Sequence, residues 1–300
     1  MDANVNVAAP PKAEQAWSVG GLLDWTARFL ASKGSESPRL DAEVLLAYAL
    51  DCRRIDLYTR YEEEAPADAR QRFRDLVRRR MEGCPVAYLV GRKEFFALEF
   101  EVSPAVLIPR PDSEFIVMEC LRLAEEMAEP HILDIGTGSG NIPVAVAKGH
   151  PGARLTTIDL SDTALAVASR NAERHGLAAR IRFLQGDLFR PLAAGERFDF
   201  ILSNPPYIAS EDIPGLQPGV RDYEPHLALD GGPSGYQIVD RLIAEAEDHL
   251  APRGYLILEI GAPQEAHVRA SIERQRLYEL APTIHDYSGH ARVLQARRRE

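Results

Sequence analysis

A glycine-rich turn directly after an apolar run is the first feature of the sequence with chemical meaning. The segment His131-Ile-Leu-Asp-Ile-Gly-Thr-Gly-Ser-Gly-Asn141 passes from strand-like residues into a helical run. Glycines permit a tight turn and let a ligand approach the backbone closely. A dinucleotide fingerprint that starts at Gly136 requires Gly or Ala where Asn141 stands, and a P-loop requires Lys and then Ser or Thr after its last glycine. The spacing therefore disfavours NAD(P), FAD and nucleoside triphosphates.

The spacing Asp-x-Gly-x-Gly-x-Gly resembles the first motif of class I S-adenosylmethionine-dependent methyltransferases. The resemblance implies that Asp134 helps to hold the amino-acid end of the cofactor. It also implies a loop that packs on the cofactor, made of Gly136, Thr137, Gly138, Ser139 and Gly140. Asp159 ends the next strand-like run, where a carboxylate can accept hydrogen bonds from both ribose hydroxyls. Asp187 and Leu188 follow the third run and are expected to border the adenine. Taken alone, Asp159 can also be the N-cap of a helix over 161–170.

A second motif follows the fourth strand-like run, which ends in Asn204-Pro205-Pro206-Tyr207. In isolation, this is a stop signal with a common turn residue. Next to a methyltransferase loop, it suits methylation of an amide or exocyclic amine nitrogen, which carries two N–H donors and little basicity. The side-chain carbonyl of Asn204 and the main-chain carbonyl of Pro205 can accept those hydrogens, and Tyr207 offers a flat apolar wall. We expect catalysis mainly by positioning, with these four residues as catalytic and substrate-binding groups.

Alternating strand-like and helical segments predict an α/β fold, with a doubly wound, mostly parallel, seven-stranded class I methyltransferase sheet. The strands are expected near 131–135, 154–159, 180–184, 198–203, 254–260, 277–286 and 290–296. In a sheet of order 3-2-1-4-5, the first and fourth strands are neighbours, so Asn204 is expected to face the glycine loop. The segment 204–236 is rich in proline and glycine, which is typical of a functional lid or binding loop.

The remaining patterns set the expected domain boundaries. They predict a disordered lead-in over 1–18, a helical substrate-recognition domain over 19–91, a β-hairpin linker over 92–111 and a catalytic domain over 112–300. Arginines recur from Arg70 to Arg80 on faces away from an apolar stripe. We interpret them as a solvated helix face, with a docking surface for an acidic or RNA-like partner as the alternative.

Composition narrows the class of protein. The formal net charge of −10 has the wrong sign for coating nucleic acid through phosphate contacts. The three cysteines have no metal-ligand or redox spacing, which favours reduced thiols in a cytosolic protein and predicts no metal. We expect neither a signal peptide nor a membrane-spanning helix, and therefore a cytoplasmic location.

From about Leu22 to Arg297, the chain resembles the peptide chain release factor N5-glutamine methyltransferases. The resemblance is carried by Ser37-Pro-Arg-Leu-Asp-Ala-Glu-Val-Leu-Leu46, Gly83-Cys-Pro-Val-Ala-Tyr-Leu-Val-Gly91, Lys93-Glu-Phe-Phe96, Leu107-Ile-Pro-Arg-Pro-Asp-Ser-Glu114, Tyr223-Glu-Pro225, Leu229-Asp-Gly-Gly232 and Leu258-Glu-Ile-Gly261. The linker signature around Arg110 is the most specific of these. At the adenine position a tryptophan often follows the aspartate in the family, whereas this chain has Leu188.

The resemblance implies methyl transfer from S-adenosyl-L-methionine to the glutamine N5 of the Gly-Gly-Gln motif in class 1 release factors, with S-adenosyl-L-homocysteine as product. The acidic charge suits a basic partner surface. Two alternatives stay open: N5-glutamine methylation of a ribosomal protein, and N6-adenine methylation of nucleic acid. The acidic chain lacks the basic channel and recognition domain that a DNA enzyme needs, so we expect no direct nucleic-acid substrate.

Overall fold

The computed structural model describes residues 17–300, and the chain divides into two compact units with the boundary after Gly91. The expected lead-in over 1–18 falls mostly on residues outside the described part. Trp17 and Ser18 belong to the helical unit. The Ser18 hydroxyl accepts a hydrogen bond from the Gly21 amide at 3.1 Å and caps the first helix, while the Trp17 carbonyl accepts one from Ala65 at 2.9 Å.

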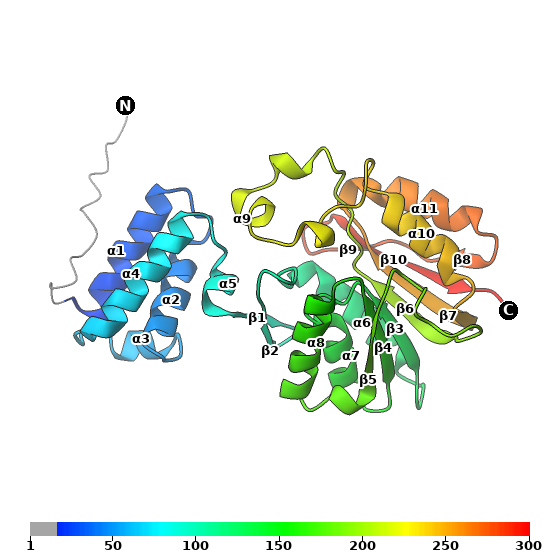
Figure 1. Cartoon of the computed structure of the whole chain (residues 1–300), viewed down its shortest axis with the longest axis horizontal. Helices are drawn as coiled ribbons and strands as arrows, with labels where there is room; N and C mark the ends of the chain where they lie inside the picture. The colour runs from blue at the N-terminus through cyan, green and yellow to red at the C-terminus, as the bar shows by residue number, and fades with distance from the viewer. Residues whose placement is uncertain (1–16) are drawn as a thin grey trace. The chain divides into compact units, whose positions relative to one another are not determined.

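The N-terminal unit is a bundle of short helices (Figure 1). Its helices are α1 (Val19–Ser32), α2 (Pro38–Ala49), α3 (Asp56–Thr59), α4 (Ala67–Met81) and α5 (Val86–Val90). Leucines at helical spacing form its core, with Leu22, Leu23, Leu45 and Leu46 almost fully buried. Burial of one face of each helix against the others stabilises elements that are too short to be stable alone.

The arginines of α4 mostly make contacts within the unit. Arg70, expected on a solvated face, is buried and donates to the Ala65 carbonyl at 2.6 Å. Arg72 donates to the Ala49 carbonyl at 2.8 Å, and Arg80 pairs with Asp41 at 3.0 Å. The expectation of a solvated face is thus wrong for Arg70, because its guanidinium satisfies a carbonyl at the turn that precedes α4.

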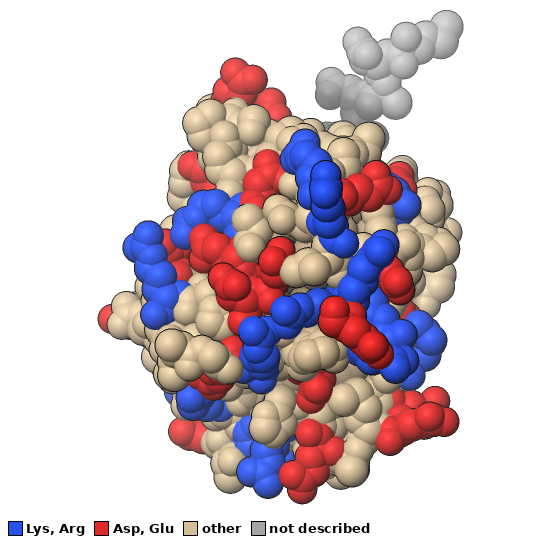
Figure 2. Space-filling view, turned by 90° about the vertical axis from the view of Figure 1, so that its right-hand side faces the viewer, with Lys and Arg blue, Asp and Glu red and all other residues tan. Residues whose placement is uncertain are grey.

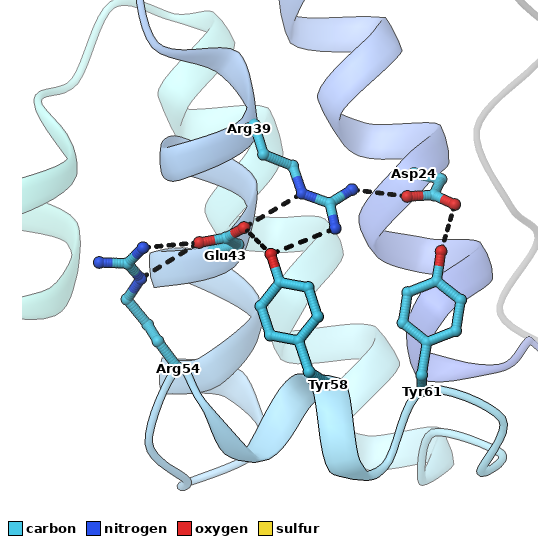
Figure 3. Close-up of polar contacts among 6 residues, drawn as sticks. All are labelled: Asp24, Arg39, Glu43, Arg54, Tyr58 and Tyr61. Carbon is cyan, nitrogen blue, oxygen red and sulfur yellow. Dashed lines mark hydrogen bonds and ion pairs between the residues drawn. The ribbon is translucent and has the colours of Figure 1, made fainter.

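A polar network joins α1, α2 and α3 (Figure 3). Glu43 on α2 is only 5% exposed, and its carboxylate accepts hydrogen bonds from Tyr58 at 2.5 Å and from Arg54 at 2.7 Å. Arg39 connects the network to α1, because it contacts Glu43 at 3.1 Å and Asp24 at 2.5 Å. Burial raises the pKa of Glu43, but the hydrogen bonds from one tyrosine and two arginines outweigh it and lower the pKa from its ordinary value.

We expect Glu43→Gln to reduce the free energy of unfolding of the N-terminal unit by about 1–3 kcal/mol at pH 7, because a neutral amide leaves the surrounding donors poorly satisfied. The difference from the wild type should shrink as the pH falls through the lowered pKa of Glu43, where protonation removes the same charge. Denaturant unfolding followed by tryptophan fluorescence measures this unit selectively, since both tryptophans of the chain, Trp17 and Trp25, belong to it.

The exposed Glu62 provides a matched control, and Glu62→Gln should leave the denaturant concentration at the unfolding midpoint unchanged. Equal stability of the wild type and the Glu43→Gln protein at pH 7 would show that the network adds nothing to the fold.

The second unit is built on a mixed sheet with helices on both faces (Figure 1). In residues 17–300 this sheet has eight strands, in the order β5-β4-β3-β6-β7-β10-β8 with β9 paired to β10 off that path. Its strands are β3 (His131–Ile135), β4 (Arg154–Asp159), β5 (Ile181–Gln185), β6 (Phe198–Ser203), β7 (Leu250–Glu259), β8 (Tyr278–Leu280), β9 (Ile284–His285) and β10 (Ala291–Arg298). The five strands from β5 to β7 pair in parallel, and β10 runs antiparallel to β7. The expected doubly wound, mostly parallel sheet is confirmed.

The register of the strands determines which candidate site residues lie close together. In the parallel pair of β3 and β6, Ile135 lies opposite Ser203. The Ser203 hydroxyl also donates to the Ile135 carbonyl at 2.7 Å, which fixes the two strand ends together. The next residues, Gly136 and Asn204, therefore leave the sheet side by side, as the predicted strand order requires.

Helices cover the sheet in two layers. Buried residues of α6 (Glu114–Ala124), α7 (Asn141–Gly149) and α8 (Asp162–Arg174) join the core on one face, and those of α10 (Gln237–Ala246) and α11 (Glu265–Arg274) join the core on the other. Short helical turns occupy connections: η1 (Pro111–Ser113), η2 (Ala178–Arg180), η3 (Ile213–Gly215), α9 (Pro218–Arg221), η4 (His226–Ala228) and η5 (Ala262–Gln264). Except for η1, η2 and η5, these turns lie within the proline- and glycine-rich segment 204–236.

One expected strand is divided in the structure. The sequence predicts a continuous strand over 277–286, but β8 ends at Leu280 and β9 begins at Ile284. Pro282 lies between them and cannot donate a ladder hydrogen bond, which accounts for the interruption. Both pieces pair with β10, so the edge of the sheet keeps its position.

The hairpin of β1 (Arg92–Phe95) and β2 (Leu98–Glu101) packs with the sheet unit. Asn171 on α8 is fully buried and joins it to the glycine loop. Its Oδ1 accepts from the Glu101 amide at 2.7 Å, while Nδ2 donates to the carbonyls of Glu101 at 3.0 Å and Ser139 at 2.8 Å. The hairpin is thus bonded, through one side chain, to the loop that follows β3.

Candidate active site

The glycine loop between β3 and α7 is shaped by backbone hydrogen bonds. Gly136 and Gly140 have φ angles of +78° and +77°, a region that favours glycine. The Gly136 amide donates to the Ile158 carbonyl at 2.8 Å, and the Gly140 amide donates to Thr137 at 2.8 Å. A Cβ added at Gly140 would lie 3.0 Å from the Cβ of Ala168. The loop therefore needs glycine both for its turn and for its contact with α8.

Asp134 lies beneath this loop and does not line the cavity beside it. It is fully buried and accepts a hydrogen bond from the Thr157 hydroxyl at 2.9 Å. The buried hydroxyl of Thr137 also lies close enough to this carboxylate to act, together with the Thr157 hydroxyl, to lower its pKa. Burial raises the pKa of Asp134 to about 7.

Asp159, at the end of β4, holds the loop from the neighbouring strand. One carboxylate oxygen accepts from the Gly138 amide at 2.9 Å, and the other accepts from the Ser161 amide at 2.9 Å. Burial raises the pKa of Asp159, and these backbone donors oppose that effect. The alternative role as a helix cap is wrong, because Ser161 caps α8 by accepting from the Ala164 amide at 3.1 Å. Each oxygen of Asp159 keeps a lone pair for a ligand at the cavity wall.

Asp187 and Leu188 follow β5 and also line the cavity. Arg241 of α10 holds Asp187 through two hydrogen bonds of 3.2 and 3.0 Å. Leu188 is buried with a φ of +49°, so its backbone adopts a left-handed turn that is uncommon for leucine. An aliphatic side chain thus stands at the position where the family that the sequence resembles often has tryptophan.

Asn204 follows β6 and lies beside the glycine loop. Its backbone carbonyl would be 3.8 Å from a Cβ added at Gly136. Its side-chain Nδ2 donates to the Ser113 hydroxyl at 3.0 Å, and that hydroxyl donates to Glu259 at 2.6 Å. Asn204, Pro205 and Pro206 all line the cavity that the glycine loop borders.

Tyr207 is partly buried and does not border the cavity. Buried Gln264 holds its carbonyl with a hydrogen bond of 3.0 Å and contacts the Gly235 carbonyl at the same distance. Burial raises the pKa of the Tyr207 phenol to about 12, and the charge of Glu259 adds to this effect. The phenol therefore stays protonated at neutral pH.

The cavity has a volume of about 360 Å³, within the range of small-molecule sites. One wall consists of the glycine loop, Asp159 and Leu188. Another is formed by the first three residues of the segment 204–207, which we call the Asn204 corner. Residues of the segments 104–110 and 225–230 complete it. A partly buried ion pair holds these two segments together, since Arg110 donates at 2.5 Å to Glu224, the residue just before the second segment. The structure thus brings the first four residues of the predicted loop, Asp159, Asp187, Leu188 and the first three residues of the Asn204 corner to one cavity, but not Asp134, Gly140 or Tyr207.

Two residues at this corner were not predicted as site residues. Ser113 and Glu259 lie within sequences that carry the family resemblance, but neither was given a role. The sequence did hold one signal for them. Glu259 follows the apolar run of β7, and a carboxylate at the end of a buried strand needs a hydrogen-bond or ion-pair partner.

Comparison with known proteins identifies the family. A profile of the PrmC N-terminal domain matches residues 21–91, and one of the methyltransferase small domain matches residues 113–215. A release factor glutamine methyltransferase of Rhodopirellula baltica is 45% identical over 284 residues, which cover 93% of this chain and 95% of that protein. The chain belongs to the release factor glutamine methyltransferase family. A further member, from Geobacter sulfurreducens, is 43% identical over 94% of this chain and 98% of its own length.

As a member of this family, the chain is a methyltransferase. Its fold is similar to that of a 16S rRNA methyltransferase of T. thermophilus solved with AdoMet and guanosine, with a TM-score of 0.50 and 20% identity over 69% of this chain and 50% of that one. Among the described helices, none has the length and apolar character to cross a bilayer. Within residues 17–300, no three His, Cys, Asp or Glu side chains are grouped as metal ligands.

Proposed function

We propose that this methyltransferase transfers the methyl group of S-adenosyl-L-methionine to the N5 atom of the glutamine in the Gly-Gly-Gln motif of class 1 release factors, in the cytoplasm. The observation that carries the proposal is the position of Asn204, next to the glycine loop at one cavity, in a chain of this family. The expected product from the cofactor is S-adenosyl-L-homocysteine.

The residues at the cavity fit S-adenosylmethionine. The loop 136–140 and the carboxylate of Asp159 would hold it, with Leu188 against the base. A Cβ at Gly138 would meet no protein atom within 4 Å, so the backbone there is open to a ligand. The cofactor supplies an electrophilic methyl group on a sulfonium centre.

The Asn204 corner would position the target amide. A glutamine side chain presents two N–H donors, which the side-chain carbonyl of Asn204 and the main-chain carbonyl of Pro205 can accept. This orients the weakly basic nitrogen and holds it in a near-attack geometry. Tyr207, the last residue of this motif, keeps a neutral phenol because burial raises its pKa to about 12.

Charge favours a protein partner over nucleic acid. The formal net charge is −10, and basic and acidic side chains are interspersed on the face shown in Figure 2. The net negative charge suits contact with a basic protein more than with a phosphate backbone. We propose that the helical unit, residues 19–91, contributes to binding that protein.

Label transfer from methyl-labelled S-adenosylmethionine tests this function. A class 1 release factor should accept label, and its variant with the motif glutamine changed to alanine should accept none. Duplex DNA and purified large-subunit ribosomal proteins, assayed under the same conditions, should stay unlabelled. Label on adenine, or on a ribosomal protein but not the release factor, would overturn the proposed substrate.

A further inference from the structure

Three side chains from separate elements form a line that ends at the catalytic corner. Glu259 is the last residue of β7, Ser113 ends η1, and Asn204 follows β6. The Ser113 hydroxyl donates to Glu259 Oε2 at 2.6 Å and accepts from Asn204 Nδ2 at 3.0 Å. Ser113 and Glu259 are each only 2% exposed, so water does not compete freely for these bonds.

The direction of these bonds follows from the number of protons. A serine hydroxyl has one proton, and an ionised carboxylate can only accept. Because the Ser113 hydroxyl uses its one proton to donate a hydrogen bond to Glu259, its oxygen can only accept a hydrogen bond from Asn204. This arrangement selects one of the two orientations of the Asn204 carboxamide, with Nδ2 toward Ser113. Within residues 17–300, no donor reaches Asn204 Oδ1.

We propose that Ser113 and Glu259 are positioning residues that hold the Asn204 carboxamide with its oxygen available to the amide hydrogens of the target glutamine. This inference rests on the proposed function, since the available acceptor matters only if the substrate presents N–H donors. The reversed orientation presents donors to donors and cannot hold the target nitrogen. Ser113 and Glu259 thus act through Asn204 and need not touch the substrate.

The surroundings of Glu259 make the arrangement sensitive to pH. Burial and, to a smaller extent, the charge of Asp112 raise the pKa of Glu259, whereas the bond from Ser113 and the charges of Arg292 and Arg110 lower it. The balance of these effects leaves the pKa at about 7. The phenol of Tyr207 also lies within its field. A protonated Glu259 can donate to Ser113, which frees the serine proton to donate to Asn204 Oδ1. Turnover should therefore fall as the pH drops below about 7 and rise above it.

Steady-state methylation of a release factor by the full chain tests the inference through Glu259→Gln, Ser113→Ala and Ser113→Thr. We expect Glu259→Gln and Ser113→Ala to lower kcat by about tenfold or more. Cofactor affinity, measured by calorimetry, and the KM for the release factor should change less than about threefold. Ser113→Thr keeps the hydroxyl and should restore most of the turnover. In the Glu259→Gln enzyme, the pH dependence between about 6 and 8 should flatten.

Glu279→Gln, in the exposed edge of β8, is the matched control and should leave kcat and the pH profile unchanged. If a variant loses stability, a double-mutant comparison still decides. Ser113→Ala should lower kcat by less than about threefold in an Asn204→Ala background, because the residue it positions is already absent. The proposed positioning role would be overturned if Ser113→Ala lowered kcat equally in the wild-type and Asn204→Ala backgrounds. It would also be overturned if Ser113→Ala and Glu259→Gln each kept the wild-type kcat and pH profile. A wild-type enzyme that leaves the release factor unlabelled would contradict the proposed function instead.

Discussion

Replacing Asn204 with alanine is expected to lower product formation by about 10²-fold or more, the scale for loss of one preorganised hydrogen-bonding group at a reacting centre. Asn204 lines the cavity beside the glycine loop, but its side-chain hydrogen bond goes to Ser113 and not to that loop. Affinity for S-adenosylmethionine should therefore change by less than about tenfold. Single-turnover methylation of a release factor and calorimetric titration with the cofactor measure the two quantities separately.

The Asn204→Asp variant is the natural companion, since it keeps the shape but replaces the Nδ2 donor with an acceptor that faces Ser113. It should be as inactive as the alanine variant. If Asn204 were only a turn residue after β6, both variants would lose folding stability and keep near-normal turnover per folded molecule. That pattern would remove Asn204 from the catalytic machinery.

The second large effect is expected at Asp159. Asp159→Ala should weaken binding of S-adenosylmethionine at least tenfold, because hydrogen bonds to a charged group contribute about 1.5–3 kcal/mol each. The structure adds a reason, since the same carboxylate holds the Gly138 and Ser161 amides at 2.9 Å. Removal of the side chain therefore also releases the glycine loop. Calorimetry with the full chain gives the affinity directly.

Asp162→Ala provides the comparison three residues along the chain. Asp162 is an exposed acidic residue in the first turn of α8, outside the cavity, and contributes only about 0.3–1 kcal/mol to helix stability. Its loss should leave cofactor affinity unchanged. Unaltered affinity in the Asp159→Ala protein would place the nucleoside elsewhere and refute the assigned cofactor site.

Sequence patterns predicted those features of the site that depend on local sequence, namely the strands and the residues at their ends. The apolar runs of β3 and β6 are buried on both sides, so they are recognisable as strands of a parallel sheet. The strand order of a doubly wound sheet, 3-2-1-4-5, then makes these two strands neighbours, which brings Gly136 and Asn204 together. This reasoning needs no knowledge of side-chain geometry.

The remaining features depend on contacts between residues far apart in the sequence. Ser113 and Glu259 meet because η1 packs at the end of β7, and no local pattern encodes that contact. Asp134 has the expected place in its motif, yet strand pairing with β4 directs its carboxylate to Thr157, beneath the loop rather than into the cavity. The burial of Arg70 likewise depends on the turn before α4.

The three hydrogen bonds of Asn171 bear on where domains of this family can be exchanged. An exchange of N-terminal domains between relatives that joins the chains at residue 112 brings in a foreign hairpin, whose Glu101 backbone must still meet the buried carboxamide. A poor match leaves that carboxamide partly unsatisfied and loosens its grip on Ser139 in the cofactor loop. A junction just before Arg92 keeps hairpin, α8 and loop from one parent. In such an exchange, the hairpin therefore has to come from the same parent as the catalytic unit, whichever relative supplies the helical domain.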